Sequence, residues 1–412
     1  MNQPLSILLV TLRFPPHVVG GYEQIAGELA VGLRERGHRV HVLCGRSAQL
    51  ESTDDVWPEL EPRIDGAQNL FELSHAGSNR ERWALHFHSR DNAAATRRAI
   101  RETRPDAVVY LNLGLASIAP LLEARRAGLP RIGVICDAWP ANHWVRDWRE
   151  RGGKRLRLAV LEWVWARWRR YVGLGRMLVA SESLRDELTE AGFSRAELEL
   201  VPLALPPEVE REAFDAPIPE RRAGQPLVVV CTSSQWEGKG LHVLLDAASV
   251  AVEEGTDLEV VLVGDGDRDY RARLERQAAS PELEGRVRFT GRLPQSELGS
   301  VFRSAHVFVF PSTWSEPFGR ASLEAMAFGL ALVASDVGGI SEQFVDGESG
   351  LSVAAGDANA FARALVDLGA DEGRRRELAR RGREHVDRHF RSQHFFDAVE
   401  RRLAEEMAKV RA

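Results

Sequence analysis

Short apolar runs alternate with longer stretches of helical periodicity along most of the chain. They lie at residues 7–10, 40–43, 108–111, 132–135 and 178–180 in the first half, and at 227–230, 260–263, 287–289, 307–310 and 332–334 in the second. Apolar runs of this length between helices are typical of buried strands in parallel, doubly wound sheets. The pattern predicts an α/β fold with one Rossmann-like sheet in each half.

A stretch rich in proline and charged residues separates the two halves. It covers residues 206–224 and includes Pro206-Pro207 and Arg221-Arg222. Such a composition favours loops over regular elements. We therefore expect a first Rossmann-like domain at residues 1–205, a linker at 206–224, and a second Rossmann-like domain at 225–390, with a central cleft between the two domains.

Composition narrows the class of protein. With 412 residues, 44% hydrophobic and 28% charged, the chain is long enough for two domains with cores of their own. Its net charge of -6 argues against nucleic acid as the principal partner. The cysteines, Cys44, Cys136 and Cys231, are widely spaced and lack metal-ligand spacing, which is typical of reduced thiols. No basic leader or long apolar span is present, so a cytoplasmic location is expected.

Two carboxylates stand out where the apolar run at 307–310 ends. Glu316 lies in a loop, and Glu324 lies eight residues later in a predicted helix that starts near Gly319. A helix N-terminus offers unpaired N–H groups to a phosphate, and glycine lets a ligand approach the backbone closely. Glu324 can accept hydrogen bonds from a ribose diol, and Glu316 can bind sugar hydroxyls or stabilise positive charge at an anomeric carbon. The alternative is that Glu324 only stabilises its helix and Glu316 is solvated.

Two further loops follow predicted strands. Lys239, between Gly238 and Gly240, is placed to neutralise a leaving diphosphate, unless it is an ordinary exposed lysine. Gly20-Gly21 follows the first strand and suits a phosphate or a sugar hydroxyl, unless it is only a tight turn. This loop lacks the G-x-G-x-x-G pattern, so a nicotinamide cofactor is poorly supported.

Taken together, these motifs resemble the retaining glycosyltransferases of family 4 (glycosyl transferases group 1), which have the GT-B fold. The resemblance covers nearly the whole chain and rests on six elements in the family's order, including the E-x7-E element at Glu316 and Glu324: residues 15–21, 237–240, 263–266, 289–293, 316–324 and 337–342. It implies transfer of a sugar from a nucleotide-diphosphate sugar to a hydroxyl acceptor with retained anomeric configuration, and without a metal or other cofactor. It also implies that the last helix, within 391–412, packs on the first domain.

The resemblance assigns site residues. Glu316, Asp137 and Lys239 are expected to be catalytic, and the donor is expected to bind Gly20, Gly21, Ser234, Gly264, Arg292, Leu293, Phe318, Gly319, Arg320 and Glu324. Two positions depart from the family. Ser234 stands where relatives carry an arginine for the diphosphate, a role that Arg320 can take over. Cys136-Asp137 replaces a His-Asp pair, which makes Asp137 the better candidate to deprotonate or orient the acceptor hydroxyl, with Trp139 and His143 nearby on the acceptor side.

A basic, tryptophan-rich segment lies at residues 144–176. It carries ten Lys or Arg residues against three acids. This composition is typical either of an interfacial helix that contacts a membrane surface and a lipid-linked acceptor, or of an ordinary helix with buried tryptophans and solvated arginines.

Two other functions stay open at the level of sequence. An epimerase or hydrolase of nucleotide sugars on the same fold would need no acceptor. A degenerate, non-catalytic nucleotide-sugar-binding protein would explain the missing arginine and histidine. The sugar, the base, the acceptor and the oligomeric state are not determined by the sequence.

Overall fold

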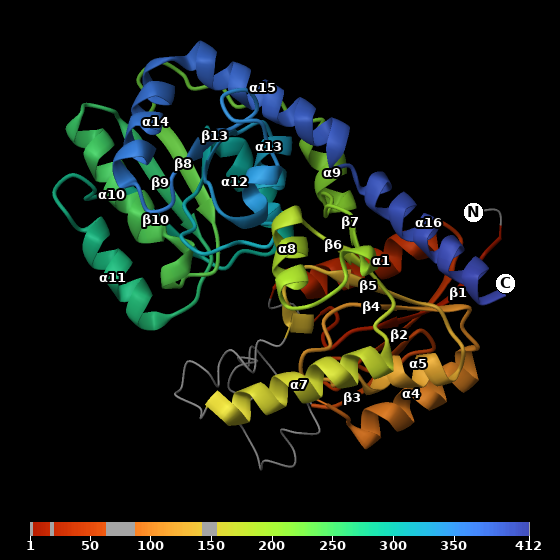
Figure 1. Ribbon diagram of the computed structural model, residues 1–412. Coiled ribbons are helices and arrows are strands. Elements are labelled where there is room, and N and C mark those ends of the chain that lie inside the picture. Colours follow the sequence, from red (N-terminus) through yellow and green to blue (C-terminus); the bar gives the residue numbers. More distant parts are fainter. Residues whose placement is uncertain (1–2, 17–19, 63–86, 142–154, 412) are drawn as a thin grey trace. The chain divides into compact units, whose positions relative to one another are not determined.

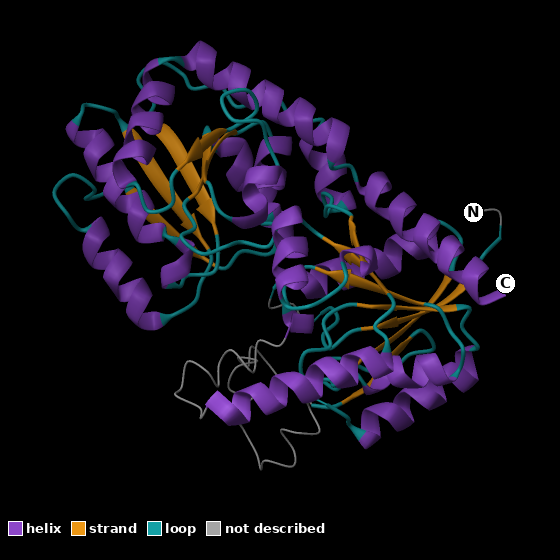
Figure 2. Cartoon of the chain, viewed as in Figure 1, coloured by secondary structure: helices purple, strands orange, loops and turns teal. Residues whose placement is uncertain are grey.

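A computed structural model describes residues 3–16, 20–62, 87–141 and 155–411. The chain divides into two compact units, the first made of Met1–Val201 with Phe396–Ala412 and the second of Pro202–Phe395. Each unit is a parallel sheet with helices on both faces (Figures 1 and 2). The predicted fold of two Rossmann-like parallel sheets is confirmed.

The first unit contains a sheet of seven parallel strands in the order β3-β2-β1-β4-β5-β6-β7. The order reverses direction between β1 and β4, which is the switch point where ligands bind in open α/β sheets. The strands are β1 (Ser6–Val10), β2 (Arg39–Gly45), β3 (Val56–Leu60), β4 (Ala107–Tyr110), β5 (Arg131–Ile135), β6 (Arg176–Val179) and β7 (Leu198–Leu200).

Helices α4, α5 and α7 lie on one face of this sheet, and α1 and α16 on the other (Figure 1). From Phe396 onward α16 belongs to this unit. Its Phe396 ring fills the space beside Gly32 of α1, and its Glu400 accepts hydrogen bonds from Arg36 (2.8 Å) and contacts His38 (2.7 Å). The helices are α1 (Gly21–Glu35), α4 (Arg90–Thr103), α5 (Ala119–Arg126), α7 (Arg155–Val172), α8 (Glu182–Glu190) and α16 (Ser392–Arg411), with short 3-10 turns η1 (Trp139–Ala141) and η2 (Arg195–Glu197).

The second unit contains a sheet of six parallel strands in the order β10-β9-β8-β11-β12-β13, with its switch point between β8 and β11. The strands are β8 (Leu227–Thr232), β9 (Leu258–Val263), β10 (Val287–Gly291), β11 (Val307–Phe310), β12 (Ala331–Ser335) and β13 (Leu351–Val353). Helices α10, α11 and α14 pack on one face and α9, α12 and α13 on the other, while α15 contacts both α13 and α14.

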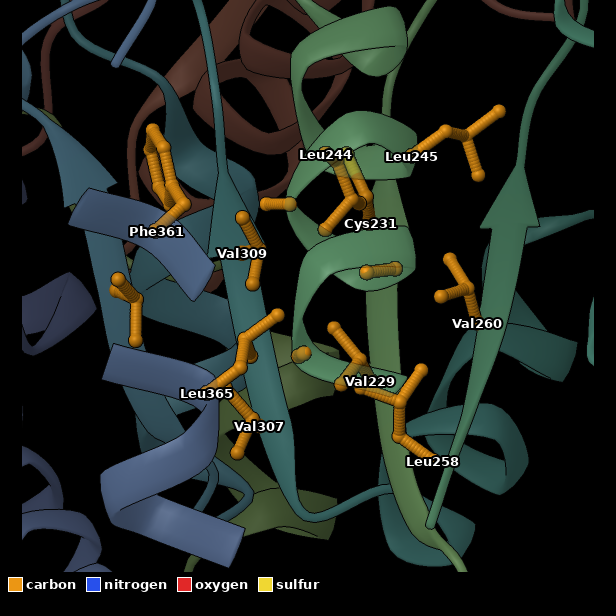
Figure 3. Close-up of a cluster of buried hydrophobic side chains, with 14 of the residues drawn as sticks. Val229, Cys231, Leu244, Leu245, Leu258, Val260, Val307, Val309, Phe361 and Leu365 are labelled. Atoms are coloured by element: carbon orange, nitrogen blue, oxygen red, sulfur yellow. The ribbon is translucent and has the colours of Figure 1, made fainter. Parts of the chain in front are cut away.

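The core of the second unit lies between the sheet and helices α10 and α14. Figure 3 shows side chains of β8, β9 and β11, such as Val229 and Val309, meeting Leu244 of α10 and Phe361 of α14. The helices are α9 (Pro207–Ala213), α10 (Leu241–Glu253), α11 (Arg268–Ala278), α12 (Gln295–Ser304), α13 (Arg320–Ala327), α14 (Ala358–Ala370) and α15 (Glu372–His389), with 3-10 turns η3 (Glu237–Lys239) and η4 (Gly338–Glu342).

The stretch expected to be a linker, residues 206–224, is part of the second unit. It forms α9, which packs on α12 and α13. Two arginines of α15 hold the rest of it, because Arg375 donates to the carbonyl of Pro219 (2.9 Å) and Arg383 to that of Ala216 (2.8 Å). In this proline-rich segment, arginine side chains rather than a neighbouring strand donate hydrogen bonds to these backbone carbonyls.

Candidate active site

Two charged side chains meet at the switch point of the second sheet. Lys239, in η3 after β8, forms an ion pair with Glu316, in the loop after β11, and both side chains are largely buried. The two residues lie 77 positions apart, so the strand order brings them together. The structure thus joins two of the three predicted catalytic residues in one site at the carboxyl ends of adjacent strands.

The backbone of both loops is held by direct hydrogen bonds. The Gly238 carbonyl accepts from the N–H groups of Thr313 (2.9 Å) and Trp314 (3.2 Å). The Glu316 carbonyl accepts from the N–H of Gly339 in η4 (2.7 Å). Since each loop is fixed on another segment of the second unit, the ion pair is positioned before a ligand binds.

Glu324 occupies the second turn of α13, and its side chain is buried. Gln295 of α12 donates from Nε2 to its Oε2 (3.1 Å). The helix begins after Gly319, which has a φ of 81°, and a Cβ there would lie 2.6 Å from Ile340 Cδ1. Glycine is therefore required at the position where the loop turns into the helix and where the first helical N–H groups face outward.

Gly264 follows β9, in a loop that contacts the loop after β8. Its φ is 125°, and a Cβ would lie 1.9 Å from the carbonyl oxygen of Ser233. Gln235, which is fully buried, joins the same two loops by donating from Nε2 to the Gly264 carbonyl (2.8 Å). Ser234 and Arg292 are exposed. The loops after β8 and β9 are thus in contact, as a shared binding role of Ser234 and Gly264 requires.

Phe318, predicted to bind the donor, has a buried side chain. It is 3% exposed and its ring contacts that of Phe390 (6.1 Å between centroids). Its carbonyl accepts a hydrogen bond from the amide of Gln343. Phe318 therefore anchors the loop through packing, while Gly319 and Arg320, which are half-buried, remain the ligand-facing candidates of this trio.

The first unit has a cavity of about 320 Å³ at the carboxyl ends of β1, β4 and β5. Gly20, Gly21 and Asp137 line it, as the predicted roles of these residues require. The N–H of Gly20, however, donates to Glu23 Oε2 (2.8 Å). The start of α1 therefore binds its own carboxylate through this N–H, and the donor contacts of Gly20 and Gly21 stay a prediction.

Asp137 is held at the edge of this cavity by α1. The Tyr22 hydroxyl lies 3.3 Å from Asp137 Oδ1, and the N–H of Trp139 donates to the same oxygen (2.9 Å). Trp139 itself is 6% exposed, and its ring packs edge-to-face on Tyr110 (6.3 Å between centroids). Its ring therefore has little open surface for the acceptor contact expected from the sequence. His143 lies outside the described residues.

Comparisons with known proteins agree with this geometry. The sequence profile "Glycosyltransferase Family 4" matches residues 19–209, and the profile "Glycosyl transferases group 1" matches residues 213–385. The chain belongs to glycosyltransferase family 4. It is an enzyme, a glycosyltransferase.

Relatives of this glycosyltransferase act on different acceptors. It is 27% identical to phosphatidyl-myo-inositol mannosyltransferase of Mycolicibacterium smegmatis over 374 residues, which cover 90% of this chain and 87% of the relative. It is also 27% identical to glycogen synthase of Mycobacterium tuberculosis over 396 residues, with 94% and 91% coverage. The names of these two relatives therefore refer to a phospholipid and to a polysaccharide.

Solved structures share the GT-B fold. Sucrose-phosphate synthase from Thermosynechococcus elongatus superposes with a TM-score of 0.73 at 19% identity, covering 98% of this chain and 100% of that one. Anabaena HepE in complex with UDP superposes with a TM-score of 0.69 at 18% identity, covering 97% and 100%. At these identities the likeness establishes the fold of the glycosyltransferase.

The basic segment contains both buried and exposed aromatic side chains, the two alternatives that the sequence left open. Along α7, Trp165 is buried and donates to the Pro140 carbonyl (3.2 Å), whereas Trp163 is 64% and Tyr171 56% exposed. The exposed residues repeat at helical spacing and form one face, which we call the α7 surface: Val160, Trp163, Arg167, Arg170 and Tyr171. The part of the segment at 144–154 lies outside the described residues.

Two negative findings apply to the described part of this glycosyltransferase. It contains no group of three or more His, Cys, Asp or Glu side chains placed to hold a metal ion. None of its helices is long and apolar enough to cross a bilayer.

Sequence reasoning missed three residues that shape the site. Tyr22, Gln235 and Gln295 each bind a predicted site residue or its loop across 29 to 115 positions. Only Gln235 carried a signal, since it lies in the loop of the missing arginine. The other two are recognisable only once the fold brings the elements together.

Proposed function

We propose that this glycosyltransferase transfers a sugar from a nucleotide-diphosphate sugar to a hydroxyl acceptor, with retention of configuration and without a metal. The observation that carries the proposal is the Lys239–Glu316 ion pair at the β8/β11 switch point, beside the N-terminus of α13. A single ammonium at this position can stabilise the leaving diphosphate, while the carboxylate contacts the sugar. HepE, which shares the fold, binds UDP, and the mannosyltransferase relative supports a sugar donor.

The second unit supplies the donor contacts in this proposal. Glu324 accepts hydrogen bonds from the ribose, with Gln295 fixing its other side. The N–H groups after Gly319 bind the diphosphate at the start of α13. Arg320 and the exposed Ser234 take the place of the arginine found in relatives, and Gly264, Arg292 and Leu293 line the base.

The first unit supplies the acceptor contacts. Asp137 lines the cavity at the ends of β1, β4 and β5 together with Gly21, and it receives or orients the proton of the acceptor hydroxyl. No step needs a covalent intermediate, because positioning and charge stabilisation suffice for the transfer. Activity that is unchanged by EDTA would agree with the metal-independent reaction, and activity restored only by a divalent ion would contradict it.

A panel of UDP-, GDP-, ADP- and dTDP-linked sugars tests the donor, since a ligand that binds only the native state raises Tm. We expect one class to raise Tm and the others not. Incubation of that donor with candidate acceptors then separates the functions: a glycosylated product supports transfer, and acceptor-independent release of sugar or conversion to its epimer supports a hydrolase or epimerase. No shift with any donor would favour a non-catalytic protein.

The α7 surface favours a second role, peripheral contact with the inner face of a membrane. Arg167 lies over the Trp163 ring (5.9 Å) and Arg125 over the Tyr171 ring (5.5 Å), so cations and exposed aromatic rings share one side of the helix. Trp163, Arg167 and Tyr171, together with Phe87 and Trp168, line a hollow of about 800 Å³. Aromatic rings beside arginines suit the headgroup region of an anionic bilayer.

Co-sedimentation with phosphatidylglycerol vesicles tests this contact. We expect binding at low salt that weakens as salt rises, little binding to phosphatidylcholine, and loss of binding in a Trp163→Ser/Tyr171→Ser variant. A Trp236→Ser variant, exposed on the second unit, is the matched control. Absence of wild-type binding at low salt would remove the membrane role and leave a water-soluble acceptor.

A further inference from the structure

The Tyr22 hydroxyl is the centre of a small hydrogen-bond network in the first unit. It accepts from the N–H groups of Cys136 (2.6 Å) and Asp137 (3.0 Å), and it donates to Asp137 Oδ1 (3.3 Å). One donor and two acceptor positions are all that a phenol offers. A single side chain on the first turn of α1 therefore fixes both the backbone and the carboxylate of the loop after β5.

The network keeps the phenol protonated. Burial, together with the nearby Asp137 and Cys136 side chains, raises the pKa of Tyr22 well above its usual value. The hydroxyl thus stays a donor to the carboxylate at any pH at which the protein works. A hydrogen bond donated to a carboxylate favours its charged form.

We propose that Tyr22 is a positioning residue that holds the Asp137 carboxylate charged and aimed at the acceptor hydroxyl. The inference rests on the proposed function, in which Asp137 handles the acceptor proton. The residue before Asp137, which is a cysteine here, contributes its backbone N–H to the same hydroxyl.

Other titratable groups also lie around the cavity. In the described part of the first unit, the titratable groups that face the cavity or the network besides Tyr22 and Asp137 are Arg13, Glu23 and Cys136. Arg13 and Glu23 form a buried pair (3.7 Å) whose charges largely cancel, and Glu23 also accepts from the Gly20 N–H. Among the described residues, the Tyr22 hydroxyl and the Trp139 N–H both donate to Asp137 Oδ1.

A merely structural role for Tyr22 would stabilise α1 against the loop and leave the carboxylate unaffected. The pH dependence separates the two roles. In Tyr22→Phe the carboxylate loses a donor, so its pKa rises and the acid limb of the rate profile moves to higher pH. We expect this shift together with a loss of turnover of about tenfold, which corresponds to one charged hydrogen bond, and unchanged donor affinity.

Tyr110→Phe is the matched control. Tyr110, on β4 of the same unit, is fully buried, and its hydroxyl has no hydrogen-bond partner among the described residues. Like Tyr22→Phe, the Tyr110→Phe substitution removes one hydroxyl oxygen from the first unit, but that hydroxyl does not contact Asp137. The profile is measured on release of nucleoside diphosphate from the donor that the panel identifies, in the presence of the acceptor that becomes glycosylated.

A second measurement does not depend on turnover. In protein labelled with carboxyl-¹³C aspartate, the signal missing from Asp137→Asn reports the Asp137 titration, and we expect its midpoint to rise in Tyr22→Phe and not in Tyr110→Phe. An unchanged midpoint and acid limb in Tyr22→Phe would overturn the inference. An acid limb and turnover that survive in Asp137→Asn would instead contradict the proposed role of Asp137 itself.

Discussion

At the scale of single residues, the proposed donor site depends on the carboxylate of Glu324 and on the hydrogen bond that it accepts. Glu324 is buried beside Gln295 and is proposed to bind the ribose diol. Glu324→Gln replaces a charged acceptor with a neutral amide, which weakens each hydrogen bond. We expect the preference for a ribonucleoside diphosphate over its 2′-deoxy counterpart to fall roughly tenfold or more. Calorimetric titration measures it, with exposed Glu284→Gln as control; an unchanged preference would contradict the ribose contact.

Sequence reasoning could place residues at strand ends. Glu316 and Lys239 each follow an apolar run, and parallel strands end at the same edge of a sheet, whereas Asp137 was assigned through the family resemblance. Sequence reasoning could not show that the Trp139 ring packs on Tyr110, since the direction of a side chain after a strand depends on packing that no local pattern encodes. It also missed Tyr22, because its partner lies 115 positions away.

At the scale of elements, the turn into α13 depends on the backbone conformation of Gly319. Alanine there would be in the left-handed region and 2.6 Å from Ile340 Cδ1. We expect Gly319→Ala to lower the free energy of unfolding by about 1–3 kcal/mol. Gly285→Ala is the control, since its φ of 75° is similar but nothing lies within 4 Å of its Cβ. Urea denaturation compares them, and equal losses would exclude a contribution from the Ile340 contact.

A buried histidine at the start of β11 makes the second unit sensitive to acid. Burial, and then the charge of Arg375, lowers the pKa of His306 to about 4, and its Nδ1 accepts from the Val228 N–H (2.9 Å). The unfolded chain, with an ordinary pKa near 6.5, binds the proton first, so stability is lost as pH falls from about 6.5 to about 4.

The expected loss over this range is on the order of 3 kcal/mol. His306→Gln should be less stable at pH 7 but should show a flatter dependence between these limits, which urea unfolding at several pH values would reveal. Parallel pH profiles for the two proteins would contradict a role for His306.

Elements were predicted according to how apolar they are. The ten apolar runs named in the sequence analysis all form strands, while β3, β7 and β13 were not predicted. Two of these have only three residues, and β3 (Val56–Leu60) is a partly exposed edge strand that contains Pro58, so neither hydrophobicity nor length distinguished them. Residues 206–224, predicted to be a linker, lie in the second unit, where Arg375 and Arg383 bind the carbonyls of a segment with little apolar pattern of its own.

At the scale of the whole molecule, two sheets with similar switch points carry different chemistry. The first unit places a cavity and Asp137 at the ends of β1, β4 and β5, and the second places Lys239, Glu316 and Glu324 around β8 and β11. The proposed division into an acceptor unit and a donor unit predicts that Asp137 contributes little to nucleotide binding. Variants of Asp137 should therefore slow transfer without weakening the affinity for nucleoside diphosphate.

Release of nucleoside diphosphate from the nucleotide-sugar panel in the presence of the acceptor that becomes glycosylated, by the wild type and by Glu316→Gln, tests the central claim most directly. The account predicts that the wild type turns over one donor class, and that Glu316→Gln slows this release roughly 100-fold or more while still binding the nucleoside diphosphate. Full turnover by Glu316→Gln, with exposed Glu284→Gln as the reference, would contradict the claim that the Lys239–Glu316 pair is the centre of the reaction.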